Sequence, residues 1–350
     1  MNATSASLGG DTRTPIAAPH ATHKFRLLLR REFWEHKGGF FWAPFVAGAI
    51  SLLLTLMAII VGEVVARRAM ADGKINIDND VTINGLDLGH LTSRMSPDDL
   101  QNLSNGVDLS LYASATWPFI VLGFVVFFYC LGALYDERKD RSVLFWKSLP
   151  LSDRDTVLSK AASALVVAPV IAVGAAIATM FAFLLMISVA VLFHGGNPIT
   201  LLWGPGSPLA VVGNLIAMLP IYALWALPTV GWLMLCSAWA RSKPFLWAVM
   251  IPVFAGIFVA WFDIMNVFNL DTTWFWQHVV ARSLTSVFPG LWMSASNFDH
   301  LHGPDQIGEL LSLRSTYTVL ASPQLWIGAV AGIAMIIGAI RLRRWRDDNV

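Results

Sequence analysis

Residues 134–153 read LYDERKDRSVLFWKSLPLSD and lie between two long apolar runs. The charged part, Asp136 to Arg141, is followed by an apolar core, Val143 to Trp146, that a plain connection between membrane spans does not need. This pattern predicts a short amphipathic helix at 142–150 that is presented to a soluble partner. An interfacial anchor for lipid headgroups is the alternative interpretation of the same residues.

The chain around this stretch is strongly apolar. Of its 350 residues, 56% are hydrophobic and 13% are charged, and the mean hydropathy is +0.60, which excludes a water-soluble domain. A helix needs about 20 apolar residues to cross a hydrocarbon core of roughly 30 Å. Such segments lie at about 40–65, 116–135, 157–193, 208–239, 245–263 and 324–340. They are too long and too uniform for barrel strands, so the sequence predicts an all-α membrane protein with six transmembrane helices.

Charge decides the expected orientation. With six spans, both termini share a side with the 136–160 and 240–244 loops, and 18 of the 24 Lys and Arg residues fall on that side. The other six are Arg67, Arg68, Lys74, Arg94, Arg282 and Arg314. Because basic residues concentrate in cytoplasmic loops, both termini are expected in the cytoplasm. A hairpin within 161–193 would break this asymmetry, so one long tilted helix is expected there.

The two ends of the chain are polar. Residues 1–23 are rich in Ala, Thr, Ser, Gly and Pro and are expected to be a disordered tail, and residues 347–350 are expected to be a short C-terminal tail. Residues 24–37 read KFRLLLRREFWEHK, which predicts an interfacial helix over 24–38 with an apolar stripe. The six-span domain is then expected to occupy 39–346.

Two segments are expected outside the membrane on the far side. Residues 66–115 form a small extracytoplasmic insert, with a helix start at Ser96. In this insert a short hairpin is expected, with Ile75 and Ile77 on one strand, Val81 and Ile83 on the other, and the turn at Asp78-Asn79-Asp80. The segment 264–323 is rich in aromatic residues, which favours short helices at the outer interface. A turn at Phe288-Pro289-Gly290 that makes 273–297 re-entrant is the alternative.

Few patterns in the chain carry chemistry. No phosphate-binding loop of the Gly-x-x-x-x-Gly-Lys-Ser/Thr type occurs, so no nucleotide site is expected on this chain.

Glu63 lies one turn before Arg67 and is expected to pair with it, and Asp263 is expected to be hydrated. A loose group of possible zinc ligands, Asp299, His300, His302 and Asp305, lacks a fixed third ligand. Neither a catalytic nor a metal site is expected, and Cys130 and Cys236 fall inside spans, which argues against a disulfide.

The chain resembles the membrane-spanning permease subunit of the ABC-2 family of ABC transporters. The resemblance rests on the six-span plan, on the amphipathic helix before the first span and, most specifically, on LYDERKDRSVLFWKSLPLSD. It implies that 142–150 is a cytoplasmic coupling helix seated in a cleft of a nucleotide-binding subunit. The expected contacts to this ATPase partner are Arg138, Arg141, Leu144, Phe145, Trp146, Lys147 and Leu149.

The same resemblance implies a function and a location. ATP and Mg would bind to the partner subunit, and two permeases, as a homodimer or heterodimer, would form an exporter in the bacterial cytoplasmic membrane. An apolar, aromatic pathway with few buried charges favours a hydrophobic or amphiphilic substrate moved by alternating access, and no contact with nucleic acid is expected. The alternative is a membrane-embedded sensor or scaffold that relays an extracellular signal to a cytoplasmic partner.

Overall fold

Six of the helices are long and apolar enough to cross a membrane. The computed structural model describes residues 21–71, 81–82, 85–86, 96–140, 152–265, 271–293 and 313–347. Within these residues the six candidate spans are Gly38–Ala69, Gln101–Lys139, Asp153–Phe193, Pro208–Trp239, Pro244–Ile264 and Pro323–Trp345. Each expected span lies inside one of them, so the chain is an all-α, multi-pass membrane protein. The third is one continuous helical segment, as the charge asymmetry predicts.

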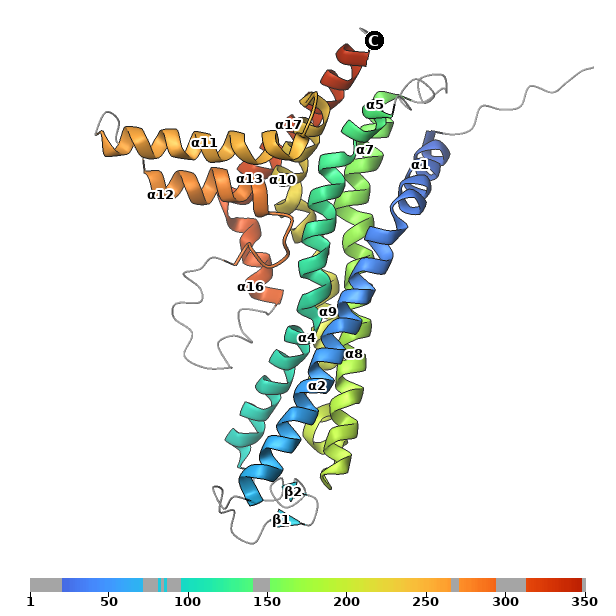
Figure 1. The fold of residues 1–350 in the computed structure, drawn as a ribbon, viewed down its shortest axis with the longest axis vertical. Helices are drawn as coiled ribbons and strands as arrows, with labels where there is room; N and C mark the ends of the chain where they lie inside the picture. The colour runs from blue at the N-terminus through green and yellow to red at the C-terminus, as the bar shows by residue number, and fades with distance from the viewer. Residues whose placement is uncertain are drawn as a thin grey trace, which may run out of the picture.

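Three long helices form the main bundle, and they lie side by side along the long axis of the molecule (Figure 1). They are α2 (Ala43–Ala71), α4 (Pro97–Gly132) and α8 (Ala168–Phe193). α2 follows α1 (Ala21–Glu35) and the π-helical turn η1 (Gly38–Trp42). α4 leads into α5 (Tyr135–Lys139), whereas α8 continues α7 (Asp153–Ala162) through η2 (Ser163–Val167). Gly48 of α2 lies against the hydroxyl of Thr179 in α8, so the absence of a side chain there permits close packing.

The remaining helices make a second group. They are η3 (Ile199–Trp203), α9 (Pro208–Ala217), α10 (Leu219–Trp239), α11 (Pro244–Ile264), α12 (Thr272–Phe275), η4 (Trp276–Ala281), α13 (Arg282–Thr285), α16 (Leu313–Thr318), η5 (Val319–Ala321) and α17 (Pro323–Asp347). The expected fourth span is therefore two helices, because α9 ends before Met218 and α10 begins with Pro220 in its first turn. In Figure 1 α11 and the segment from α12 to α13 lie side by side, across the long axis of the main bundle.

The expected insert at 66–115 is shorter than the sequence indicates. α2 continues to Ala71, and α4 begins at Pro97, well before the expected span. The helix start is confirmed: the Ser96 hydroxyl accepts from the Asp99 N–H at 3.2 Å, and the Asp99 carboxylate accepts from the Ser96 N–H at 3.0 Å. Between the helices, β1 (Val81–Thr82) pairs antiparallel with β2 (Gly85–Leu86). Val81 is therefore in the first strand and pairs with Leu86, whereas the sequence predicts it in the second strand of a hairpin that turns at 78–80.

The segment 271–293 is packed into the protein. The ring of Phe288 lies against Gly123 in the middle of α4, where a Cβ would come within 2.2 Å of it. The hydroxyl of the buried Tyr222 in α10 donates to the carbonyl of Val287 at 3.0 Å. The turn after α13 therefore packs against α4 and α10, and the re-entrant and the interfacial interpretations of this segment both stay predictions. Residues 294–297 lie outside the described part.

The structure brings the basic segments of the chain to one end, which we call the inner end. α1, α5, the start of α7 and the C-terminal part of α17 meet there (Figure 1). The loop after α10 lies at the same end, because Arg138 in α5 donates to the carbonyl of Ala240 at 3.1 Å. β1 and β2 lie at the opposite end of the main bundle.

Candidate functional site

The predicted coupling segment is bracketed by two described helices. α5 ends at Lys139 and α7 begins after the N-cap Ser152, whose hydroxyl accepts from the Asp155 N–H at 3.0 Å. The predicted contacts Arg141, Leu144, Phe145, Trp146, Lys147 and Leu149 fall between these helices, outside the described residues. The structure therefore shows how the two flanks of the coupling segment are held.

A buried cluster of charges joins these flanks to the first and last helices of the chain. Lys160 in α7 places its Nζ 3.0 Å from Oε1 of Glu32 in α1 and 3.0 Å from Oε1 of Glu137 in α5. Arg343 in α17 lies 2.8 Å from Oε2 of Glu137 and 3.2 Å from Oδ1 of Asp153 in α7. We call Glu32, Glu137, Asp153, Lys160 and Arg343 the inner charge cluster.

Four members of the cluster are almost completely enclosed, whereas the side chain of Asp153 is 27% exposed. The exposed fractions are 0% for Glu32, 2% for Lys160, 5% for Arg343 and 7% for Glu137. Glu32 has a second partner, because the Tyr129 hydroxyl donates to its Oε2 at 2.9 Å. Buried charges are tolerated when they are paired and hydrogen-bonded, and breaking such a pair is far more costly than breaking one at the surface. The cluster therefore fixes the relative positions of α1, α4, α5, α7 and α17.

Arg138, a predicted partner contact, is turned toward the protein. Its guanidinium donates to the carbonyls of Ser237 and Ala240 at the end of α10 and, at 3.4 Å, to that of Leu134. The Ser237 hydroxyl in turn accepts from the backbone N–H groups of Leu134 and Tyr135 at 3.0 and 2.9 Å. A cation that satisfies the last carbonyls of a helix stabilises its end. Arg138 thus joins α5 to α10, and its contact with a partner stays a prediction.

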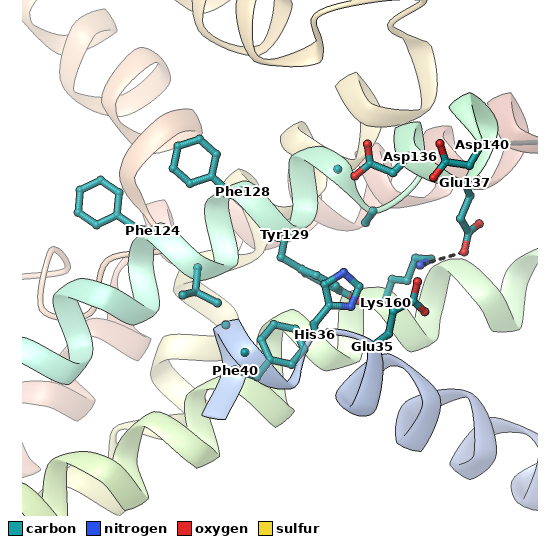
Figure 2. Close-up of a pocket in the computed structure, with 15 residues that line it drawn as sticks. Glu35, His36, Phe40, Phe124, Phe128, Tyr129, Asp136, Glu137, Asp140 and Lys160 are labelled. Carbon is teal, nitrogen blue, oxygen red and sulfur yellow. Dashed lines mark ion pairs between the residues drawn. The ribbon is translucent and has the colours of Figure 1, made fainter. Parts of the chain in front are cut away.

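A cavity of about 610 Å³ opens beside the cluster (Figure 2). The carboxylates of Asp136, Glu137 and Asp140 gather where α4 passes into α5, whereas aromatic rings line the other part. Tyr129 packs edge-on against His36 and Phe40, with ring centroids 4.7 and 4.9 Å apart. Carboxylates next to aromatic faces suit a cationic group with an apolar body, such as a basic side chain of a partner.

The far end of the bundle carries a smaller polar contact. Glu63 pairs with Arg67 at 2.6 Å, as the sequence predicts, and also accepts from Nε2 of His194 at 2.9 Å. A hydrogen bond to the Ala190 carbonyl and the contact with Glu63 raise the pKa of His194 above its usual value.

Asp263 lies elsewhere, at the end of α11, and accepts from the Thr272 hydroxyl at 2.7 Å. These contacts tie helix ends together, which supports a structural role for both acids.

The described residues offer no obvious place for a metal. Within them, no group of three or more His, Cys, Asp or Glu side chains is arranged to hold an ion. The weak group Asp299, His300, His302 and Asp305 lies outside the described residues. Cys130 and Cys236 are both free and buried.

Sequence reasoning missed the inner charge cluster, although one signal for it was present. Glu32 follows Leu28 by four residues on the apolar stripe of α1, which is where a charge is least expected. Lys160 likewise begins an apolar run, and a topology count treats it only as a basic residue of a loop. A charge on the apolar side of a helix predicts a buried partner of opposite sign.

Comparison of the chain with models of known protein families, with curated protein sequences and with solved structures finds no match.

Proposed function

We propose that this chain is the permease subunit of an ATP-driven ABC exporter of the ABC-2 type, forming the pathway for a hydrophobic or amphiphilic substrate. The observation that carries the proposal is the inner charge cluster, which fixes both flanks of the 142–150 segment to other helices. A simple connecting loop does not need its two ends held by buried ion pairs. A segment that receives force from a partner does need such a support.

The arrangement suggests how force would travel. A push on 142–150 moves α5 and α7, which are continuous with the long helices α4 and α8. Glu137 and Lys160 pass the displacement to α1 and α17 through Glu32 and Arg343. Arg138 passes it to α10. A partner that contacts 142–150 differently in two nucleotide states would therefore bias the whole set of helices between two arrangements, which is the requirement for alternating access.

ATP hydrolysis is assigned to the partner. The chain contains no phosphate-binding loop, so ATP and Mg would bind to a separate nucleotide-binding subunit. Two permeases, identical or different, would complete the exporter in a bacterial cytoplasmic membrane, with the inner end and both termini in the cytoplasm. The basic residues that the structure gathers at the inner end support this orientation.

The test is affinity purification of the chain from its native membrane, followed by mass spectrometry of the soluble proteins recovered with it. Wild type is compared with the double variant Phe145→Ala and Trp146→Ala, which removes the two aromatic anchors of the predicted interface. The matched control is Phe258→Ala with Trp261→Ala. Those two side chains are 63% and 61% exposed and lie on α11, away from the coupling segment.

We expect a subunit with ATPase motifs to accompany wild type and the control, and to be lost from the Phe145/Trp146 variant while membrane insertion is unchanged. Equal recovery of the ATPase with that variant would contradict the coupling assignment. Repeated recovery of the chain alone, or with a signalling protein in place of an ATPase, would favour the sensor.

A further inference from the structure

Arg282 lies in an unusual place for an arginine. The sequence assigns it to an outer loop, but the structure buries it between α10 and α17, with 9% of its surface exposed. Its backbone carbonyl accepts from the hydroxyl of Thr229, midway along α10, at 2.8 Å. The guanidinium lies 4.1 Å from the centroid of the Trp225 ring and presses against Gly328, where a Cβ would come within 2.6 Å of it.

The guanidinium is not neutralised by the described part of the protein. Its Nε and one terminal nitrogen are buried and have no hydrogen-bond partner there. Among the described residues no carboxylate pairs with it, and the face of Trp225 offers only a cation–π contact. An arginine stays charged in proteins, and an unpaired charge at the depth of the spans is costly. Such a group is retained where it meets an anion that is not part of the chain.

A cavity of about 430 Å³ lies in front of this arginine. Its walls come from α10, α11, α12, η4, α13 and α17 and are mostly apolar, and they include Trp232, Ile251, Ala255, Trp274 and Ile327. No carboxylate is among the described residues that line it. The other polar groups are Ser283 and the pair His278 and Gln324, whose nitrogens lie 2.8 Å apart.

The cavity is reached from the apolar surface of the molecule. Ile251 and Ile327, on two of its walls, are 37% and 70% exposed, and the neighbouring surface of α11 is apolar. A ligand therefore enters from the hydrocarbon side, with its charged group toward Arg282 and its apolar part along Ile251 and Ile327. A cavity with mostly apolar walls and one arginine suits a ligand in which a single anionic group is joined to an apolar chain.

We propose that this cavity binds an anionic amphiphile, with Arg282 pairing with its phosphate or carboxylate group. The proposal concerns binding to this chain and holds with or without an ATPase partner. The ligand has two sources of the same chemistry: an anionic phospholipid of the surrounding bilayer, or a free single-chain amphiphile. If the chain is a permease, such a molecule is also the class of cargo that the cavity accepts.

The experiment is native mass spectrometry of the purified full chain after delipidation and addition of defined ligands. The probes are dioleoyl phosphatidylglycerol, dioleoyl phosphatidylcholine and oleate, which separate the headgroup charge from the acyl chain and the bilayer lipid from the free amphiphile. The variants are Arg282→Gln, which removes the cation, and Ala255→Phe, which fills the cavity and leaves Arg282 in place. The control is Arg314→Gln, because Arg314 is exposed and lies on α16.

We expect wild type and the Arg314 variant to retain phosphatidylglycerol or oleate over phosphatidylcholine. The Arg282 variant should lose this preference by about tenfold or more, the loss expected for a hydrogen bond to a charged group. Retention of phosphatidylglycerol alone identifies a bilayer lipid, and retention of oleate alone identifies a free amphiphile. Ala255→Phe should reduce binding of either anion, and it keeps the experiment decisive if the Arg282 variant fails to fold. An unchanged anion preference in a folded Arg282 variant, or in Ala255→Phe, would overturn the proposal.

Discussion

At the scale of single residues, Lys160 is the centre of the inner charge cluster. It is the cation that Glu32 and Glu137 share, at 3.0 Å from each. Glu32 is fully buried, and its other described side-chain contacts are the neutral Tyr129 hydroxyl at 2.9 Å and Nδ1 of His36 at 4.0 Å. Removing Lys160 therefore leaves Glu32 in the interior without its nearest cation, or forces it to take up a proton.

The variant Lys160→Met should lower the free energy of unfolding by about 3–5 kcal/mol, the usual cost of removing one partner of a buried ion pair. The measurement is equilibrium unfolding of the purified chain in detergent, followed by circular dichroism. Lys139→Met, at an exposed position on α5, is the matched control and should change the free energy by less than about 0.5 kcal/mol. Adding Glu32→Gln to Lys160→Met should recover part of the lost free energy of unfolding. A Lys160→Met variant as stable as the control would show that the ion pairs of Lys160 do not support the fold.

Residue-level reasoning from the sequence succeeds where partners are close in the chain and fails where they are distant. The Glu63–Arg67 pair and the Ser96–Asp99 cap are confirmed, because helical geometry places residues three or four apart side by side. Arg138 contacts Ala240, Lys160 contacts Glu32, and Arg282 contacts Thr229, which lie 102, 128 and 53 positions away, and spacing carries no information on them. The count of basic residues per loop assigned Arg282 to an outer loop. Such a count uses only the position of a residue between two spans, so it does not show that the segment around Arg282 packs against α10 and α17.

At the scale of elements, the closest approach of one backbone to another at the glycines of the described residues is between α10 and α17. A Cβ on Gly332 would lie 2.4 Å from the carbonyl oxygen of Leu227, and one on Gly231 would lie 2.4 Å from that of Gly332. The obstacle is backbone in both cases, so it cannot move aside as a flexible side chain does. Small residues let membrane helices approach in this way. Gly174 in α8 differs, because no atom lies within 4 Å of where its Cβ would be.

Gly332→Ala should therefore destabilise the chain by about 1–3 kcal/mol, because one added methyl group forces α10 and α17 apart. The matched control is Gly174→Ala, for which neutral or slightly higher stability is expected, since alanine favours the helix and meets nothing. Thermal unfolding of the two variants in the same detergent gives the comparison. Equal stability would show that the contact between α10 and α17 is looser than the structure has it.

The elements themselves were largely predictable. Hydropathy locates all six candidate spans, because a long apolar run must be buried in lipid or protein whatever its neighbours are. Boundaries were less accurate: α4 begins at Pro97, since the polar residues after its cap still favour a helix when one side of it is packed. The direction of α11 across the main bundle depends on contacts with η4, such as Gly256 with Trp276, which periodicity does not show.

At the scale of the whole molecule, the arrangement of the helices agrees with the charge asymmetry of the sequence. The sequence groups basic residues into separate segments, and the structure gathers α1, α5, the start of α7 and the end of α17 at one place. Arg138 brings the end of α10 to the same place through its hydrogen bond to Ala240. The asymmetry therefore predicts a common side of the membrane for segments from four regions of the chain.

Cysteine labelling in intact cells tests this arrangement. The native background is low, because Cys130 and Cys236 are 0% and 2% exposed. Single cysteines at Lys139, Ser242 and Arg344 should resist a membrane-impermeant maleimide in intact cells and react after permeabilisation. Cysteines at Arg68 and Asp98, exposed residues of α2 and α4 toward the opposite end, should react in intact cells. If the cysteines at the first three positions differ in labelling, the common inner end is contradicted. If both groups show the opposite labelling, the fold stands and its orientation is inverted. The coupling segment would then lie where no cytoplasmic ATPase can reach it.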